Sequence, residues 1–188
     1  MDQVERLAAA IAGLAPEEKR RLFELLGRDS ELPAEPTPSG GRVRPLPARD
    51  RQGWSPDYVL IFDGGSRGNP GWGYGSYAIV RVQDGAQRLE RRDFGDDYTN
   101  NEAEYDALLA GLEDLLSRIE EAGRKPEEFK LEVRGDSALV INQLQGRWKA
   151  KEPRMKERRD RCLELLGRFG ATQLKAHPRE ESVRVLGH

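Results

Sequence analysis

Apolar side chains recur at helical spacing in the first part of the chain. Residues 2–13 and 16–27 each carry an apolar stripe, and Leu7, Ile11 and Leu14 form the first one. Pro16 suits the first turn of the second helix, and Gly27 is a typical helix stop. The pattern predicts a helical hairpin over residues 1–27, which offers only a small core to hold it together.

The next segment has no periodic apolar pattern. Residues 28–56 contain six prolines and three glycines, with few side chains that could form a core. Such a composition is typical of a flexible linker. We therefore expect residues 28–56 to join the hairpin to a separate domain over residues 57–188.

From residue 57 the apolar positions form short runs followed by longer amphipathic segments. Strands are expected at 58–63, 75–82, 88–95, 129–136 and 172–178, and helices at 100–123, 137–146 and 154–170. Turn-rich segments between the first three strands indicate antiparallel hairpins. The order β-β-β-α-β-α-α-β predicts an α/β domain, a mixed sheet with helices on its faces.

Composition limits the function classes. The chain has 188 residues with 31 basic and 33 acidic side chains, so its formal net charge of −2 gives no global attraction to nucleic acid. Cys162 is the single cysteine, which excludes an internal disulfide and a cysteine-based zinc site. The first residues do not resemble a signal peptide, and no apolar run reaches the length of a membrane span. We therefore expect a cytoplasmic protein without membrane contact.

Three acidic residues stand where strands and a helix would converge. Asp63 is expected to end the first strand, Glu104 to lie in the first turn of the long helix, and Asp136 to end the fourth strand. In an α/β sheet such ends gather at one edge. Clustered carboxylates repel one another unless a cation lies between them. All-oxygen ligands favour Mg²⁺ or Mn²⁺.

Each acid also has an ordinary structural explanation. Asp63 could close a turn, Glu104 could interact with the helix dipole, and Asp136 could cap the helix that begins near Ser137. No single acid decides between a structural and a chemical role. The three acids together with their flanking sequence do decide between these roles.

Three segments resemble the successive motifs of type 1 ribonuclease H, in its archaeal-like short form. They are "FDGGSRGNPGWGYGSYAIV", "YTNNEAEYDALLAGL" and "VRGDSALVINQLQGRWKAKEPRMK", in family order over residues 58–179. The resemblance implies the ribonuclease H fold, with a mixed five-stranded sheet and helices on both faces. It also implies metal-dependent cleavage of the RNA strand in RNA–DNA hybrids, with Asp63, Glu104 and Asp136 as metal ligands.

The glycines after Asp63 fit such a site. Bulky side chains there would keep a nucleic-acid backbone away from the metal, whereas glycines permit close approach and a tight turn. Exposed N–H groups could donate to phosphate or to a ribose 2′-hydroxyl. A plain hairpin turn is the alternative, but it does not explain the carboxylate.

Other substrate contacts are implied by the resemblance. The asparagines before Glu104 match residues that reach the minor groove of the hybrid, and one of them is also expected to cap the long helix. The basic run around Trp148 favours phosphate contacts on the DNA strand over a merely solvated face, and Trp148 could equally be a core anchor. The expected substrate-binding residues are Gly64, Gly65, Ser66, Arg67, Asn69, Asn100, Asn101, Ser137, Arg147, Trp148, Lys149 and Lys151.

The carboxy-terminal segment departs from the family pattern. The family closes with Pro-Arg-Glu-x-Asn-x-x-Ala-Asp and a last helix, whereas this chain reads "HPREESVRVLGH". Arg179 matches a basic residue used near the scissile phosphate. Ser182 replaces the asparagine, Leu186 stands where the fourth carboxylate belongs, and the last helix is expected to be absent.

A missing acid weakens one of the two cation sites that phosphodiester cleavage uses, because leucine cannot bind Mg²⁺. His188, its terminal carboxylate, Glu180 or Glu181 are candidate replacements. A histidine outside the site is the alternative for His188.

The sequence thus predicts a ribonuclease H acting on RNA–DNA hybrids, with double-stranded RNA as a further candidate partner. Catalysis is assigned to Asp63, Glu104, Asp136, Arg179 and His188, and metal binding to all of these except Arg179. The alternative is a hybrid- or double-strand-binding module with weak or lost cleavage.

Overall fold

The structure is a computed structural model that describes residues 54–186. The predicted helical hairpin and most of the predicted linker lie outside the described residues, and so does His188. The boundaries of those predicted regions therefore stay predictions.

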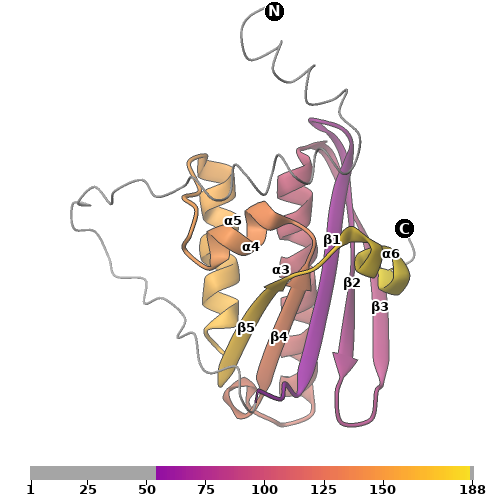
Figure 1. Cartoon of the computed structure of the whole chain (residues 1–188), viewed down its shortest axis with the longest axis vertical. Coiled ribbons are helices and arrows are strands. Elements are labelled where there is room, and N and C mark those ends of the chain that lie inside the picture. Colours follow the sequence, from indigo (N-terminus) through magenta and orange to yellow (C-terminus); the bar gives the residue numbers. More distant parts are fainter. Residues whose placement is uncertain (1–53, 187–188) are drawn as a thin grey trace, which may run out of the picture. The chain divides into compact units, whose positions relative to one another are not determined.

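The described residues form a five-stranded sheet and its helices (Figure 1). The three antiparallel strands come first, the long helix follows, and the two parallel strands come later. In chain order the elements are β1 (Tyr58–Gly68), β2 (Gly71–Arg81), β3 (Gln87–Tyr98), α3 (Asn100–Glu121), η1 (Pro126–Glu128), β4 (Lys130–Gly135), α4 (Ala138–Leu144), α5 (Pro153–Leu166), β5 (Ala171–Ala176) and α6 (Arg179–Leu186).

The sheet is mixed, as the sequence predicts. Its strand order is β3-β2-β1-β4-β5. β1 pairs antiparallel with β2, and β2 pairs antiparallel with β3. β4 pairs parallel with both β1 and β5. β1 is therefore the central strand of the sheet, with β2 on one side and β4 on the other.

Alternation along β1 divides the core into two layers. Leu60 and Phe62 pack with Tyr77 and with buried residues of α3, α4 and α5 on one face of the sheet. Val59 and Ile61 pack on the other face, with Ala78 and Leu186 of α6. The predicted arrangement with helices on both faces is confirmed, and α6 covers the second face (Figure 1).

One expectation about an element end is wrong. β1 does not end at Asp63 but continues to Gly68, because its pairing with β2 runs from Tyr58↔Arg81 to Gly68↔Gly71. The carboxy-terminal segment forms α6 from Arg179 to Leu186, a helix that was not predicted from the sequence, and the residues after it lie outside the described residues. None of the described helices is long and apolar enough to cross a membrane.

Candidate active site

Asp63 lies on β1 where the parallel half of the sheet stops. The β1–β4 pairing ends at Phe62↔Gly135, whereas the β1–β2 pairing continues past Asp63. One edge of β1 therefore loses its β4 neighbour at this residue. Asp63 is nevertheless only 3% exposed, so the carboxylate lies in a recess of the protein.

Gly64 lets α3 approach this recess. A Cβ at Gly64 would lie 2.4 Å from Ala103 C and O and from Glu104 N, closer than any side chain can come. This glycine is therefore required for packing of the helix backbone, a reason that the sequence interpretation, based on substrate approach, missed. The close contact brings Glu104 beside Asp63, and the backbone of Gly64 acts to lower the pKa of the Glu104 carboxyl.

Asp136 follows β4 directly and completes the group. The N-cap of α4 is Ser137, whose hydroxyl accepts a hydrogen bond from Val140 N, so Asp136 is not used as the cap. One carboxylate oxygen from each of Asp63, Glu104 and Asp136 lies within 4.8 Å of the other two. The structure thus brings together the three acids that the sequence selected.

The electrostatics of this group fit a cation. Burial first, and then the charges of Asp136 and Asp63, together raise the pKa of Glu104 to about 9, although the charge of Arg179 acts to lower it. Glu104 Oε2 and Asp136 Oδ1 are buried and have no hydrogen-bond partner among the described residues. Buried acceptors of this kind normally have partners. A hard divalent cation would satisfy them and remove the repulsion.

Arg179, at the start of α6, is a basic group that lies beside the carboxylates. Its Nη1 lies 3.8 Å from Asp136 Oδ2, and its side chain is 71% exposed. The guanidinium can therefore turn toward a bound anion while staying beside the carboxylates. Nearby, Ser182 is fully buried and its hydroxyl lies 3.1 Å from His177 Nε2, which helps to hold the start of α6.

Leu186 has a packing role. It is fully buried in the apolar cluster with Val59, Ile61 and Ala78. The residue in the place of the expected fourth acid thus anchors α6 to the sheet.

The hairpin tip and the start of α3 are joined by amide hydrogen bonds. Asn100 Oδ1 accepts from Ser66 N at 2.8 Å, and Asn69 Oδ1 accepts from Asn100 N at 3.3 Å. Both donors are backbone N–H groups, so the two amide oxygens are the acceptors. Neither Nδ2 group donates to an acceptor within residues 54–186, and both side chains are at the surface. Asn69 and Asn100 thus present donors outward.

The N-cap of α3 is Thr99, and the expectation that Asn100 or Asn101 caps the helix is wrong. Thr99 and Glu102 form a reciprocal capping box, in which Glu102 N donates to the Thr99 hydroxyl and Thr99 N donates to Glu102 Oε2. Residues 99–102, "TNNE", have the Thr-x-x-Glu spacing that is typical of a capping box. Asn100 and Asn101 are the exposed first residues of the helix, and Glu104 lies beyond its first turn.

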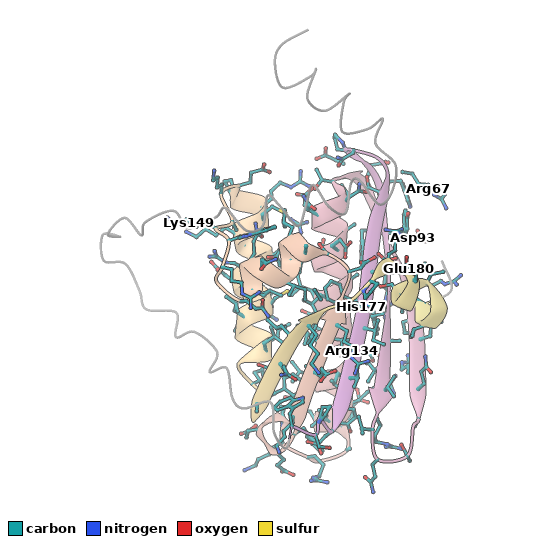
Figure 2. All side chains as sticks on the ribbon, in the orientation of Figure 1. Arg67, Asp93, Arg134, Lys149, His177 and Glu180 are labelled. Carbon is teal, nitrogen blue, oxygen red and sulfur yellow. The ribbon has the colours of Figure 1, made fainter. Side chains whose placement is uncertain are left out.

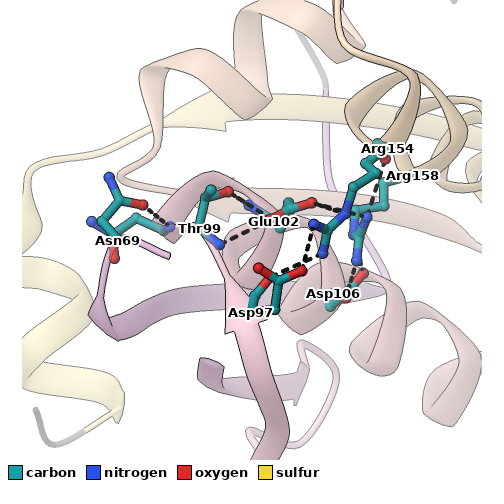
Figure 3. Close-up of polar contacts among 8 residues, drawn as sticks. Asn69, Asp97, Thr99, Glu102, Asp106, Arg154 and Arg158 are labelled. Carbon is teal, nitrogen blue, oxygen red and sulfur yellow. Dashed lines mark hydrogen bonds and ion pairs between the residues drawn. The ribbon is translucent and has the colours of Figure 1, made fainter. Parts of the chain in front are cut away.

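Two arginines of α5 support this helix start, a role that sequence reasoning missed (Figure 3). Arg154 Nε lies 2.6 Å from Glu102 Oε1, and Arg154 also binds Asp97. Arg158 forms two hydrogen bonds to Asp106, at 2.9 and 3.1 Å. Glu102 is 3% exposed, so its charge relies on these protein partners. The network fixes the first turns of α3, from which Glu104 projects.

The basic segment between α4 and α5 is at the surface. Arg147, Lys149 and Lys151 are exposed, and Lys149 points away from the sheet (Figure 2). Trp148 is 50% exposed, so its interpretation as a core anchor is wrong. An exposed indole among cations can bind a nucleic-acid backbone.

Gly65 and Arg67, the remaining expected contacts, lie on the distal part of β1 with the hairpin tip. They are separate from the basic segment, which belongs to the α4–α5 connection. The expected substrate residues thus form two groups, with the carboxylates in the recess beside the first.

The sheet order and the three converging carboxylates define a protein of the ribonuclease H-like class. A family model described as "Reverse transcriptase-like" matches residues 62–185. The chain belongs to this family.

Known proteins that are similar in sequence or structure are named as ribonucleases H. Ribonuclease HI of Halobacterium salinarum is 39% identical over 124 residues, which cover 66% of this chain and 58% of that protein. The crystal structure of RNase H1 from the same archaeon superposes with a TM-score of 0.58 at 36% identity, covering 68% of this chain and 90% of that one. LC11-RNase H1 from compost, in complex with an RNA/DNA hybrid, gives a TM-score of 0.59 at 31% identity over 68% and 90% of the two chains.

Proposed function

We propose that this chain is a divalent-metal-dependent endoribonuclease that hydrolyses the RNA strand of RNA–DNA hybrids. The observation that carries the proposal is the buried group formed by Asp63, Glu104 and Asp136, whose oxygens lie within 4.8 Å of one another. The relatives named ribonuclease H, one of them in complex with an RNA/DNA hybrid, support the choice of substrate.

The three acids would hold Mg²⁺ or Mn²⁺. Bound there, the metal would supply activated water and stabilise charge on the scissile phosphate. The protein contributes close packing around the site, since Gly64 lets the backbone of α3 approach β1. Ligands held this way need little rearrangement when the substrate arrives. One acid fewer than the family pattern makes the second cation site the weaker one.

The other groups position the nucleic acid. Asn69 and Asn100 have their amide oxygens engaged within the protein, so their Nδ2 groups are available as donors to base acceptors and 2′-hydroxyls in the minor groove. Arg179 is placed to neutralise a phosphate oxygen beside Asp136. The exposed cations Arg147, Lys149 and Lys151 suit the phosphates of the DNA strand.

Cleavage and binding can be separated by experiment. A hybrid labelled on the RNA strand is incubated with the full chain and Mg²⁺ or Mn²⁺, and a gel-shift is run with the same hybrid in chelator. Metal-dependent RNA cleavage supports the enzyme. Binding in chelator without cleavage in metal would instead support the alternative, a binding module, which is disfavoured because all three recess acids are in place. The predicted cytoplasmic location stays a prediction.

A further inference from the structure

A strip of side chains leads from the carboxylates to the tip of the β1–β2 hairpin. Side chains alternate along a strand, so Asp63, Gly65 and Arg67 lie on the same face of β1. This face also carries Val59 and Ile61 and is covered farther along by α6. Asp63 and Arg67 are four strand residues apart, which is about 13 Å at roughly 3.3 Å per residue.

Tyr74 forms the floor of this strip. Gly65 pairs with Tyr74 across the two strands, and a Cβ at Gly65 would lie 2.8 Å from Tyr74 Oη and 2.9 Å from its Cζ. The tyrosine ring therefore occupies the space above the glycine. Arg67 Cζ lies 5.9 Å from the centre of the same ring, within the range of a cation–π contact. An aromatic surface with an adjacent cation thus follows Asp63 along the strand.

Trp72 extends the strip at the hairpin tip. It pairs directly with Arg67, so the two side chains share a face, and the indole is 42% exposed. Trp72 Nε1 donates a hydrogen bond to Asp93 Oδ1 at 3.2 Å, which holds the ring in place. Figure 2 shows Arg67 and Asp93 in succession on the side of the molecule that bears α6. The indole is therefore exposed, and its hydrogen bond to Asp93 holds it in one orientation.

Unpaired nucleotides suit such a surface better than a duplex does. Exposed aromatic rings and arginines stack on single-stranded bases, whose faces are open. In a duplex the base faces are covered by their neighbours. The Asp93 carboxylate disfavours a phosphate next to Trp72 but can accept a hydrogen bond from a ribose 2′-hydroxyl, which DNA lacks.

We propose that Arg67, Trp72 and Tyr74 form a subsite for the unpaired continuation of the RNA strand beyond the end of the hybrid. The inference rests on the proposed function, because the strip begins at the carboxylates and would therefore be followed by the strand that is cut. The subsite favours cleavage a few nucleotides from the junction between hybrid and single-stranded RNA.

Four hybrids of one sequence test the subsite: blunt, with a 5′ RNA extension, with a 3′ RNA extension, and with DNA extensions. Affinity is measured by fluorescence anisotropy in chelator, and cut positions and kcat/KM are measured in metal. The parent is expected to prefer one of the two RNA extensions over the blunt hybrid by roughly tenfold. In Trp72→Ala this preference falls to about onefold, and in Trp72→Phe most of it remains because a ring is kept.

Leu89→Ala is the matched control, since Leu89 is also 42% exposed and its partner Ala78 lies on the α6 face of the sheet. It should keep the full preference. Equal affinity of the parent for blunt and extended hybrids, or a preference that survives in Trp72→Ala, overturns the subsite. An equal gain from DNA extensions, or from both RNA ends, overturns the assignment to one RNA strand. Failure of the parent to cut any hybrid overturns the proposed function instead, while the affinity ratios still test the subsite.

Discussion

Arg154 on α5 places its Nε 2.6 Å from Oε1 of Glu102, in the first turn of α3. Glu102 lies two residues before Glu104 and is nearly inaccessible to solvent. The ion pair therefore ties the start of α3, which carries the proposed metal ligand Glu104, to α5, which carries none of the three acids.

Arg154→Met is expected to lower the free energy of unfolding by about 1 to 2 kcal/mol, because it leaves a buried carboxylate with weaker partners. Arg158 Nη1, at 3.5 Å from Glu102 Oε1, retains part of the interaction. Urea denaturation at neutral pH measures the change. Arg161→Met is the control, since its partners Glu113 and Glu164 are largely exposed. An effect no larger than that of the control would show that the Glu102 pair is not a support.

Glu104 gives the metal-free protein a pH-dependent stability. The pKa of Glu104 lies at about 9, above its ordinary value of 4.5. Between these values the folded protein holds a proton that the unfolded chain has released. Stability should therefore fall as pH rises through this window, by at most about 1.4 kcal/mol per pH unit for one proton.

Denaturation in chelator at pH 6 and pH 8 measures this slope for the parent and for Glu104→Gln. The variant cannot ionise at this position, so its slope should be smaller. Added Mg²⁺ should stabilise the parent more at pH 8 than at pH 6, because metal binding requires the proton to leave. Identical slopes for parent and variant would contradict the assignment of a raised pKa.

Leu186→Ala should cost about 2 kcal/mol or more, because it removes a fully buried side chain that anchors α6. Leu186→Asp should cost more, since the carboxylate would be buried among Val59, Ile61 and Ala78. Thermal denaturation with and without Mg²⁺ distinguishes packing from metal binding. If Mg²⁺ raised the stability of the Asp variant above that of the Ala variant, the position would reach the cations and the packing role would be wrong.

Removal of residues 1–50 should leave the catalytic domain folded and active. Trp54 is retained in this truncation, and its indole N–H donates to Glu132 Oε2 at 3.2 Å. Circular dichroism and hybrid cleavage measure the outcome, with the full chain as the control. A folded truncation without cleavage would place the first 50 residues in the active site.

Asp136 and Glu104 could be found from the sequence because each lies near a recognisable element boundary, whereas Asp63 was selected by the glycine-rich motif that follows it, although β1 continues past it. Asp136 directly follows an apolar strand, and Glu104 comes shortly after a capping signal. Their convergence follows from the topology of a mixed sheet, which the order of elements already predicts.

The roles of individual residues around the site were harder to predict, because they depend on contacts between segments that are distant in the sequence. Gly64 is explained by the backbone of Ala103, and the end of β1 is set by β2 rather than by its own composition. The pairing of Arg154 with Glu102 joins residues 52 positions apart, which no local pattern reports. Leu186 looked like a lost ligand, whereas its burial is visible only once α6 is placed on the sheet.

Cleavage of a labelled RNA–DNA hybrid by the parent, Asp63→Asn and Asp160→Asn, with Mg²⁺ or Mn²⁺ and with chelator, tests the proposed mechanism most directly. Asn keeps the shape of Asp63 but removes its charge, so cleavage should fall at least about a hundredfold while the hybrid is still bound. Asp160 is exposed on α5, and its variant should cut like the parent. Parent cleavage should stop in chelator. Undiminished cleavage by Asp63→Asn, or cleavage of the hybrid in chelator, would contradict a metal site built on these carboxylates.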